Sequence, residues 1–259
     1  MSFLINLDST GVNLINESSH DYTVNFNPPI QLIGKWEMAL IKANLWYSWY
    51  NISSENNNNN LRYFNGLVYR DTIIPDGQYT ISQLNNYLHQ VMDGFGDYTI
   101  GGSGQKIYDI EMVANLSTIR VNLTLTNSYT LDLSTDDLYL LLGFDSAIIT
   151  TSGDAPYVAN INNNINTIEI HNSLVRGSYS NNNRSDTLYT FVPSSVPGTN
   201  IDIDPVSKIY IPIDSNLDSI SSIRSYLLDN TGRPVNLNGE PATYLLHFRA
   251  IDTDTRMRR

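Results

Sequence analysis

The stretch from Ile220 to Arg249 constrains the fold of this chain more than any other, because it contains two strand-like runs separated by turn signals. A period of two places one set of side chains in a core and the other set towards water or a partner. Residues of the turn types that tolerate positive φ lie between the runs, at 229–232 and 238–239. We therefore expect two strands, of which the last completes a sheet. The expected core residues are Ile223, Ser225 and Leu227 in the first run, and Tyr244, Leu246 and Phe248 in the second.

Further short runs with strand character occur along most of the chain, and no alternation of strands and helices of the βαβ kind is present. This pattern favours an antiparallel β-sandwich over a doubly wound sheet. Pro28-Pro29 follows one of the runs, so that strand is expected to be bent or to lie at a sheet edge, because proline has no N–H to donate. The other expected strands are 32–41, 61–64, 67–74, 107–113, 116–125, 166–175, 185–191 and 206–213.

Two segments predict short helices. Thr80 and Gln83 have the spacing of a capping box, and the apolar residues that follow fall on one helical face up to Gly94. The segment 134–142 predicts a second helix, with Ser134 or Thr135 as its cap and Gly143 as its end. The fold class is therefore all-β, with one or two short helices.

Composition excludes several classes of function. The formal net charge of −11 argues against nucleic-acid binding as the main role of the fold. The chain has no cysteine, which rules out disulfides, thiolate metal sites and cysteine nucleophiles. The opening residues lack the basic segment of a secretory signal, and no apolar run approaches the roughly 20 residues that span a bilayer. We expect neither a signal peptide nor a membrane span.

The length of the chain allows one large β domain or two small ones, and no linker is long enough to separate two domains. Within residues 1–259 we expect a loop and helix insertion around 53–106 and a basic tail at 250–259. The polar run Asn56 to Asn60 is expected to form an exposed loop.

The sequence contains no established catalytic or metal-binding motif. The four histidines are far apart, and none has zinc-site spacing. His171 and His247 lie on expected strands, where a structural role is the simpler interpretation. Carboxylate pairs on extended segments, Asp202 with Asp204 and Asp252 with Asp254, could contribute to a Ca²⁺ site between subunits, although turn aspartates are usually solvated. We assign no catalytic residue, metal or cofactor, and expect no enzymatic activity.

Two groups of residues are candidates for contacts. Trp46 and Trp49 have opposite parities, so one of them is expected to face outwards, although packing in the core and at its rim is the simpler interpretation of these tryptophans. Arg256, Arg258 and Arg259 place three arginines at the end of an acidic protein. They form either a solvated tail or an inward-facing arm that touches DNA or an acidic groove on a neighbour.

Several short segments follow one another in a fixed order along the chain: Gly34 to Leu40, Ser48, Trp49, Asn51, Ile52, Pro75, Gly77, Tyr79, Leu142 to Phe144, Asp229 to Gly232, Gly239-Glu240 and Leu246 to Arg249. These segments resemble motifs of the single-jelly-roll penton (minor capsid) proteins of virophages and Polinton-like viruses, with Met38 in place of Val. The C-terminal signature of that family is an Ile-rich strand, two turns and a closing Leu-His-Phe-Arg strand.

The resemblance implies one single-jelly-roll domain over residues 1–259 and a non-catalytic structural role. It further implies homopentamers at the vertices of an icosahedral capsid, surrounded by a double-jelly-roll major capsid protein, in virions assembled inside the host cell. The insertion around 53–106 could form a protruding knob. We expect lateral sheet surfaces and the N-terminal arm to make the ring contacts.

Two other hypotheses remain open at the level of sequence. A carbohydrate-binding β-sandwich, as in a lectin or a fibre-type attachment module, would use exposed aromatic side chains beside Asn and Asp. A β-sandwich hydrolase would need carboxylates or histidines that the fold brings together.

Overall fold

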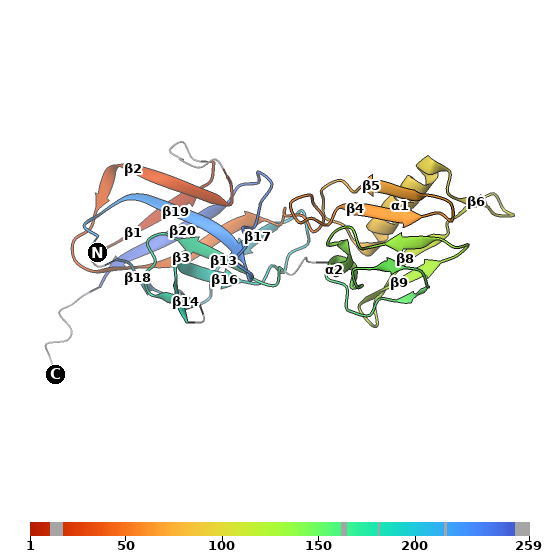
Figure 1. The fold of residues 1–259 in the computed structure, drawn as a ribbon. Helices are drawn as coiled ribbons and strands as arrows, with labels where there is room; N and C mark the ends of the chain where they lie inside the picture. The colour runs from red at the N-terminus through yellow and green to blue at the C-terminus, as the bar shows by residue number, and fades with distance from the viewer. Residues whose placement is uncertain (11–17, 162–164, 181, 215–216, 252–259) are drawn as a thin grey trace. The chain divides into compact units, whose positions relative to one another are not determined.

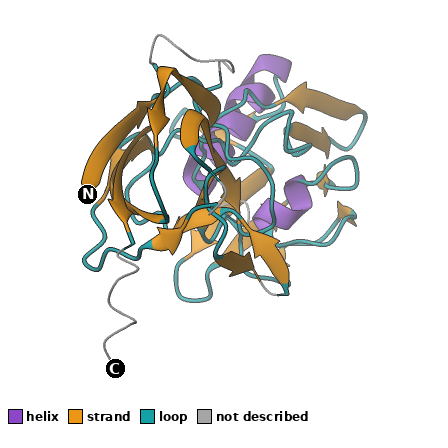
Figure 2. Ribbon diagram, turned by 90° about the vertical axis from the view of Figure 1, so that its left-hand side faces the viewer, coloured by secondary structure: helices purple, strands orange, loops and turns teal. Residues whose placement is uncertain are grey.

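A computed structural model of the chain describes residues 1–10, 18–161, 165–180, 182–214 and 217–251. The chain folds into two compact units: unit 1 comprises Met1–Trp49 and Ile165–Arg259, and unit 2 comprises Tyr50–Asn164. Every strand pair described is antiparallel, and the described residues contain two helices. Figure 2 shows how small a part of the chain is helical. The expected all-β class is confirmed.

Unit 1 contains two antiparallel layers, called sheet A and sheet B below (Figure 1). Sheet A has the strand order β1-β20-β3-β17, with β18 also paired to β3, and sheet B has the order β16-β13-β19-β2. A separate hairpin is formed by β14 and β15. The strands of unit 1 are β1 (Ser2–Asp8), β2 (Asp21–Gln31), β3 (Trp36–Trp46), β13 (Ile168–Asn172), β14 (Ser178–Ser180), β15 (Asn183–Ser185), β16 (Thr187–Phe191), β17 (Asn200–Ile203), β18 (Ile211–Pro212), β19 (Ser219–Asp229) and β20 (Thr243–Ala250).

The pairing of these strands is nested. Among the eight strands that form the main paths of the two sheets, the first pairs with the last (β1 with β20), and the second with the second-last (β2 with β19). The third pairs with the third-last (β3 with β17), and the two middle strands pair with each other (β13 with β16). A long hairpin rolled up in this way is the jelly roll, a sandwich of two antiparallel sheets. The single jelly roll expected for the chain is therefore formed by unit 1.

The core of unit 1 follows from alternation along its longest strands. On β20, Tyr244, Leu246 and Phe248 are at most 1% exposed, as expected from their shared parity. The ring of Phe248 stacks on Phe3 of the neighbouring β1, with centroids 5.1 Å apart. On β19, Ile223, Ser225 and Leu227 are buried as well. The two strands predicted between Ile220 and Arg249 thus lie in opposite sheets, and β20 is flanked by β1 and β3 rather than at an edge.

Strand β2 lies at the edge of sheet B, which explains how it accommodates two prolines. Both Pro28 and Pro29 belong to β2, and its register with β19 shifts between Ile220 and Ser222. An edge strand needs hydrogen bonds on one side only, so two missing N–H donors are tolerated there. The expected edge position is confirmed.

Unit 2 is inserted between β3 and β13, the third and fourth strands of the jelly roll. Its two larger sheets have the orders β11-β10-β4-β5 and β12-β9-β8. Its elements are β4 (Asn60–Phe64), β5 (Tyr69–Ile73), α1 (Ile81–Phe95), β6 (Thr99–Ile100), β7 (Lys106–Ile107), β8 (Ile110–Asn115), β9 (Arg120–Leu125), β10 (Thr130–Asp132), α2 (Leu138–Leu142), β11 (Ile148–Ile149) and β12 (Gly153–Asp154).

Helix α1 begins as the sequence predicts and ends two residues later than expected. Thr80 and Gln83 form the capping box, with each side chain bonded to the other residue's backbone N–H. The helix continues through Gly94, and Gly96 ends it in the left-handed conformation at φ 75°. A glycine in the last turn of a helix is tolerated, whereas the left-handed cap position favours one.

Helix α2 is shorter than expected, because it begins at Leu138 rather than near Ser134. The hydroxyl and the N–H of Ser134 both donate to Oδ1 of Asp132, so this serine belongs to a turn and caps no helix. Gly143 ends α2 as predicted, at φ 78°.

The first and last parts of unit 2 are joined by one buried amide. The side chain of Asn51 donates to the carbonyl oxygens of Tyr79 and Ile161, at 2.8 and 2.9 Å, and its Oδ1 accepts from Tyr79 N–H.

The polar run Asn56 to Asn60, expected to be an exposed loop, is also partly buried. Asn58 is 2% exposed, with Oδ1 bonded to Ser53 N–H and Nδ2 to the carbonyl of Asn51.

The expected insertion range of 53–106 lies inside unit 2, which starts slightly earlier and continues to Asn164. The physical reason is a shared core: side chains of α1, β8, β9, β10 and α2 belong to one buried cluster, so the residues after 106 pack with those before it. No helix in the described part of the chain is both long and apolar enough to cross a bilayer.

Candidate functional site

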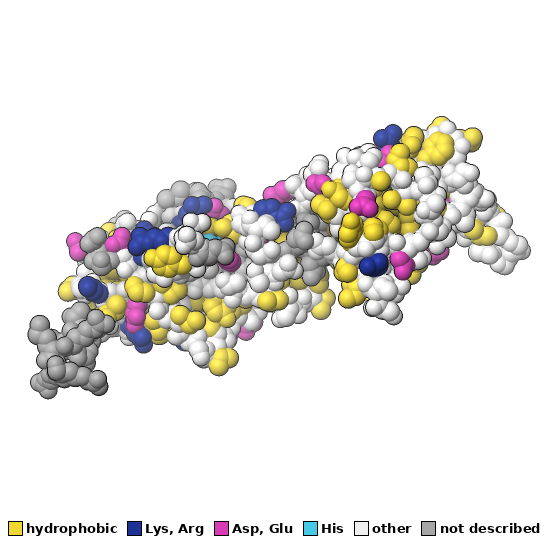
Figure 3. All heavy atoms as spheres, turned by 60° about the horizontal axis from the view of Figure 1, so that its bottom comes forward, with side chains coloured by type: hydrophobic (Ala, Val, Ile, Leu, Met, Phe, Trp, Pro, Cys, Tyr) yellow, Lys and Arg dark blue, Asp and Glu magenta, His cyan; other side chains and the backbone are white. Residues whose placement is uncertain are grey.

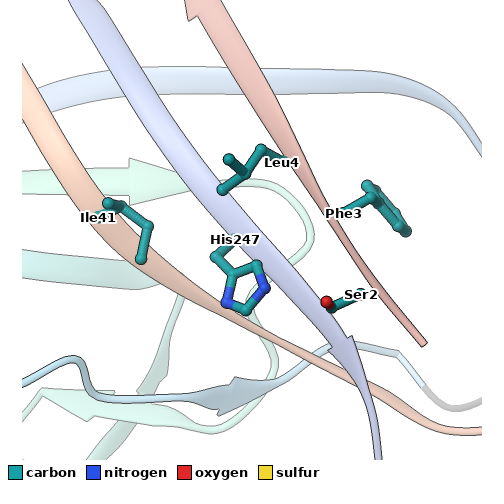
Figure 4. A pocket seen from close by; sticks show the side chains of 5 residues that line it. All are labelled: Ser2, Phe3, Leu4, Ile41 and His247. Carbon is teal, nitrogen blue, oxygen red and sulfur yellow. The ribbon is translucent and has the colours of Figure 1, made fainter.

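The outer face of sheet A carries a shallow pocket of about 480 Å³ (Figure 4). Its lining comes from the paired strands β1, β20 and β3, and Leu4 is 59% exposed beside it. The imidazole of His247 is the one ionisable group among the lining side chains. The residues that line the pocket are Ser2, Phe3, Leu4, Ile41 and His247. The surface offers apolar contact area with one polar anchor.

A compact group of polar side chains adjoins this pocket. The hydroxyl of Tyr210 and Nδ1 of His247 lie 2.6 Å apart, with the rings nearly perpendicular. The guanidinium of Arg249 lies 3.4 Å from the centre of the Tyr210 ring and pairs with Glu37 at 2.5 Å. His247 is thus held by a structural contact, as expected from the sequence for a strand histidine.

The outer face of sheet B carries a larger charged network around a buried histidine. His171 is 5% exposed, and its two ring nitrogens face the carboxylates of Glu169 and Asp186. Tyr226 on the neighbouring β19 stacks on the imidazole, with ring centroids 4.8 Å apart. The sequence predicts a structural role for His171 but identifies neither of its carboxylate partners.

In unit 2, a buried carboxylate organises the tip of the β4–β5 hairpin. Asp97 is 8% exposed and accepts hydrogen bonds from Tyr63, Asn65 and Arg70 at 2.8 to 3.1 Å. Burial alone raises the pKa of Asp97, but these three hydrogen bonds outweigh it and hold the pKa below the usual range. The carboxylate is therefore ionised at neutral pH and fixes the hairpin.

The same hairpin presents apolar side chains to solvent. Asn65, which is tied to Asp97, also accepts the N–H groups of Leu67 and Val68 at 3.0 and 2.9 Å. Leu67 is 86% exposed and Val68 47%. Figure 3 shows hydrophobic side chains at several places on the surface of unit 2. Nothing in the sequence signals Asp97, because its partners lie about 30 residues away in the chain.

The two tryptophans considered as exposed contacts have different environments. Trp49 is 4% exposed and stacks on Tyr47 with ring centroids 4.0 Å apart, so it belongs to the core of unit 1. The interpretation of Trp49 as an exposed contact is corrected. Burial alternates from Ala43 to Tyr50, so the odd-numbered side chains face the core, and Trp49 is one of them although β3 ends at Trp46. Trp46 is partly exposed, opposite Asn200 of β17.

The carboxylates considered for Ca²⁺ do not converge. Asp202 pairs with Lys42 at 3.1 Å and Asp204 with Lys208 at 2.6 Å, so each faces its own lysine. Among the described residues, no group of three or more His, Asp or Glu side chains is placed to hold a metal ion. Asp252, Asp254 and the three tail arginines, Arg256, Arg258 and Arg259, lie outside the described residues.

Comparison with known proteins gives a match at the level of fold alone. No family model matches the chain, and no curated protein matches it in sequence. Among solved structures, the chain is similar to the crystal structure of the SeMet-labelled mavirus penton protein, with a TM-score of 0.50 and 11% sequence identity. The alignment covers 97% of this chain and 100% of that chain. It therefore extends over both units, and at this identity it shows a shared fold.

Proposed function

We propose that the chain is a structural capsid protein that forms homopentamers at the vertices of an icosahedral virus capsid. One observation carries the proposal: the fold likeness to a penton protein extends over 97% of this chain and the whole of the other. It is independent of the short sequence motifs that resemble penton proteins. Those motifs also occupy fitting places, since Gly34 to Leu40 leads into β3 and Leu246 to Arg249 lies on β20.

In this proposal residues 1–259 form one single-jelly-roll domain, with unit 2 as an insertion between its third and fourth strands. Unit 2 is the protruding knob of the pentamer, and its hairpin tip at Leu67 and Val68 is part of the knob surface. The jelly roll supplies the ring.

A ring of five requires a heterologous contact, in which one surface of a subunit meets a different surface of the next. The outer faces of sheets A and B are two such surfaces on one subunit, and β1 is an open edge of sheet A. The pocket beside Leu4 and His247 lies on one of them. We assign the ring contacts to these lateral surfaces and to β1, which corresponds to the N-terminal arm expected from the sequence.

The remaining parts of the proposal follow from the same role. The protein is not an enzyme, and it resides in the virion after assembly inside the host cell. Its partners are its own copies and a double-jelly-roll major capsid protein. The tail arginines Arg256, Arg258 and Arg259 face the capsid interior, where they contact viral DNA.

The alternative role, a carbohydrate-binding module, has less support. It requires exposed aromatic side chains beside Asn and Asp, and Trp49 is buried. Trp46 and Tyr50 keep some exposed surface, Tyr50 at 38%.

Native mass spectrometry of the purified full chain tests the proposal, alone and mixed with the major capsid protein from the same virus. We expect a species of five 29.2 kDa chains, and five-fold rings in electron micrographs. A chain that stays monomeric at high concentration, and still does so with the major capsid protein present, overturns the proposal. Glycan-array binding by that monomer would favour the carbohydrate-binding alternative. A variant with all three tail arginines changed to Gln tests the tail separately, and we expect it to retain less DNA than the wild type.

A further inference from the structure

The β14–β15 hairpin carries the most exposed aromatic side chain of the described residues. Tyr179 on β14 is 66% exposed, and the exposed Arg184 lies directly opposite it on β15. The two strands of the hairpin pair only with each other among the described strands. A two-stranded ribbon is at most marginally stable by itself, and tyrosine is among the residue types that contribute most to protein interfaces. The hairpin therefore has the features of an element that contacts a partner.

The hairpin and β1 lie on opposite flanks of the jelly roll. In sheet A, β1 is the strand at one end, and β18 pairs with β3 on the side of β3 that faces away from β20 and β1. The N–H of Arg176, two residues before β14, donates to the carbonyl oxygen of Pro212 on β18 at 3.3 Å. The hairpin is thus attached at the end of sheet A opposite to β1. Two different surfaces on opposite flanks of one subunit are what a head-to-tail ring contact requires.

The edge of β1 leaves backbone groups available for a partner. The N–H of Ser9 donates to Ala242, and the N–H of Ala250 donates to Met1, so the odd-numbered residues of β1 bond to β20. The N–H and C=O groups of the even-numbered residues in 2–8 point away from β20 and have no backbone partner among the described residues. Strand β1 contains neither a proline nor a register shift, unlike the edge strand β2. An edge of this kind is open to contact with another chain.

The pocket beside β1 fits a tyrosine side chain. Its volume is about 480 Å³, and Leu4 and Ile41 give it apolar walls (Figure 4). Nδ1 of His247 faces the hydroxyl of Tyr210, whereas Nε2 has no hydrogen-bond partner in the described part of the chain. A tyrosine hydroxyl both donates and accepts, so it can bond to Nε2 in either neutral tautomer of the imidazole. A tyrosine from a neighbouring copy therefore matches both the apolar walls and the polar end of the pocket.

The charges of the two flanks are complementary. Oδ1 of Asp8, at the end of β1, accepts the N–H and the hydroxyl of Thr10, and no cation pairs with this carboxylate within the described ranges. Arg184 has no carboxylate partner within the same ranges. Four residues of extended strand separate Asp8 from Leu4 at the pocket by about 13 Å. The cross-strand spacing of the hairpin and the length of an arginine side chain together span that distance. Such a pair at the rim of a contact fixes which surfaces meet.

We propose that the β14–β15 hairpin of each copy docks on the β1 flank of the next copy in the ring, with the Tyr179 side chain in the pocket and Arg184 directed to Asp8. The occupant of the pocket is thus a second copy of this chain. The inference rests on the proposed pentamer and goes further by naming the two surfaces that meet. Each copy donates one hairpin and accepts one, so the contact repeats in one direction until the ring closes.

Native mass spectrometry of full-length variants tests the contact, under the conditions in which the wild type assembles. Tyr179→Ala should weaken each subunit contact about tenfold, as expected for an interface tyrosine. Tyr157→Ala is the matched control, because Tyr157 is 58% exposed in unit 2, and it should assemble as the wild type does. Asp8→Arg and Arg184→Asp should each weaken assembly, and the variant that combines them should recover it, because the exchanged charges attract again.

The chain has no cysteine, so a cross-link between introduced cysteines identifies the surfaces that meet. Asn6→Cys on β1 and Asn183→Cys on β15 replace exposed side chains and leave the proposed contact residues in place. With both substitutions in one chain, a short bismaleimide should give a ladder of up to five chains on a denaturing gel. Either substitution alone should give only the single chain.

The outcomes distinguish the docking contact from the proposed function. If the wild type forms pentamers and Tyr179→Ala assembles equally well, the docking contact is wrong and the pentamer stands. The same conclusion follows if the variant with both cysteines gives no ladder, or if the charge exchange restores no assembly. If the wild type stays monomeric with the major capsid protein present, the pentamer and the docking contact are both wrong.

Discussion

The two units of this chain differ in charge and in the way they are held together. Unit 2 has 12 acidic and 4 basic residues, a net charge of −8, whereas unit 1 has 14 and 11, a net charge of −3. Unit 1 is built on three strands of 11 residues each, and unit 2 has no strand longer than 6 among its described residues. Most of the acidic balance of the protein therefore belongs to the inserted unit.

The difference extends to the interior. The core of unit 1 is a continuous apolar layer between two sheets, in which alternation along long strands decides which side chains are buried. Unit 2 also has an apolar core, but its loops are fixed by buried polar side chains such as Asn51, Asn58 and Asp97. A unit with short strands has proportionally more loop backbone, and each buried loop N–H or C=O needs a partner.

The largest expected effect is in the sheet core of unit 1. Phe248→Ala removes a ring that is 0% exposed and stacked on Phe3, and should cost about 4 kcal/mol of unfolding free energy. Tryptophan fluorescence during urea denaturation measures it, because all three tryptophans lie in unit 1. Leu4→Ala is the matched control, since Leu4 lies in the same sheet and is 59% exposed. A loss below about 1 kcal/mol for Phe248→Ala would contradict the assignment of this core.

In unit 2, we expect the largest loss of unfolding free energy from the side-chain amide of Asn51 rather than from an aromatic ring. Asn51→Ala leaves the N–H and carbonyl of Tyr79 and the carbonyl of Ile161 without their buried partner, and should cost about 3 kcal/mol. Hydrogen exchange of the Tyr79 amide should accelerate strongly, and the urea midpoint should fall. Glu55→Ala, four residues away and exposed, should change neither quantity. If Asn51→Ala leaves the Tyr79 amide protected, Asn51 does not close unit 2.

This contrast explains which parts of the structure could be predicted from the sequence. The strands β19 and β20, the edge position of β2 and the start of α1 all follow from local patterns: a period of two, a proline pair and a capping box. Each depends on residues within a few positions of one another. The assignment of β19 and β20 to opposite sheets could not follow, because pairing between distant strands leaves no local trace.

The candidate sites are less predictable for the same reason. The strand pattern identifies His171 as a structural residue, but Asp186 is 15 residues away and is brought to it by the register of β13 with β16. Asn58 lies in a run of five asparagines, a composition typical of a solvated loop. Composition alone does not show that the side chain of Asn58 is buried. The opposite parities of Trp46 and Trp49 are visible in the sequence, and burial does alternate past the end of β3, but parity alone does not show which of the two faces the core.

A smaller effect, dependent on pH, is expected at the hairpin of unit 2. Asp97→Asn should cost about 2 kcal/mol at neutral pH, because it removes an ionised acceptor from Tyr63, Asn65 and Arg70. The pKa of Asp97 is lowered in the folded state, so its contribution is present above the ordinary Asp pKa and is lost as the pH falls through the lowered value. The stability difference between wild type and variant should therefore shrink in acid. A difference that stays constant from neutral pH into strong acid would show that the charge of Asp97 is not what holds the hairpin.

The smallest expected effect concerns the capping box at the start of α1 in unit 2. Thr80→Ala removes the hydroxyl that accepts the Gln83 N–H at the start of α1, and should lower the unfolding free energy by about 1 kcal/mol. Ser82→Ala is the control, because Ser82 is exposed in the first turn and alanine there favours the helix slightly. Thermal unfolding followed by circular dichroism measures both variants.

The effect of Thr80→Ala on α1 distinguishes the contribution of the N-cap from that of core packing. The helix packs against β8, and its Asn85 accepts the Met112 N–H, so loss of the cap should fray the first turn without unfolding α1. Hydrogen exchange along the helix measures this, with faster exchange confined to the residues next to Thr80. A loss of all α1 helicity in Thr80→Ala would mean that capping, and not burial of Leu84 and Leu88, holds this helix in place.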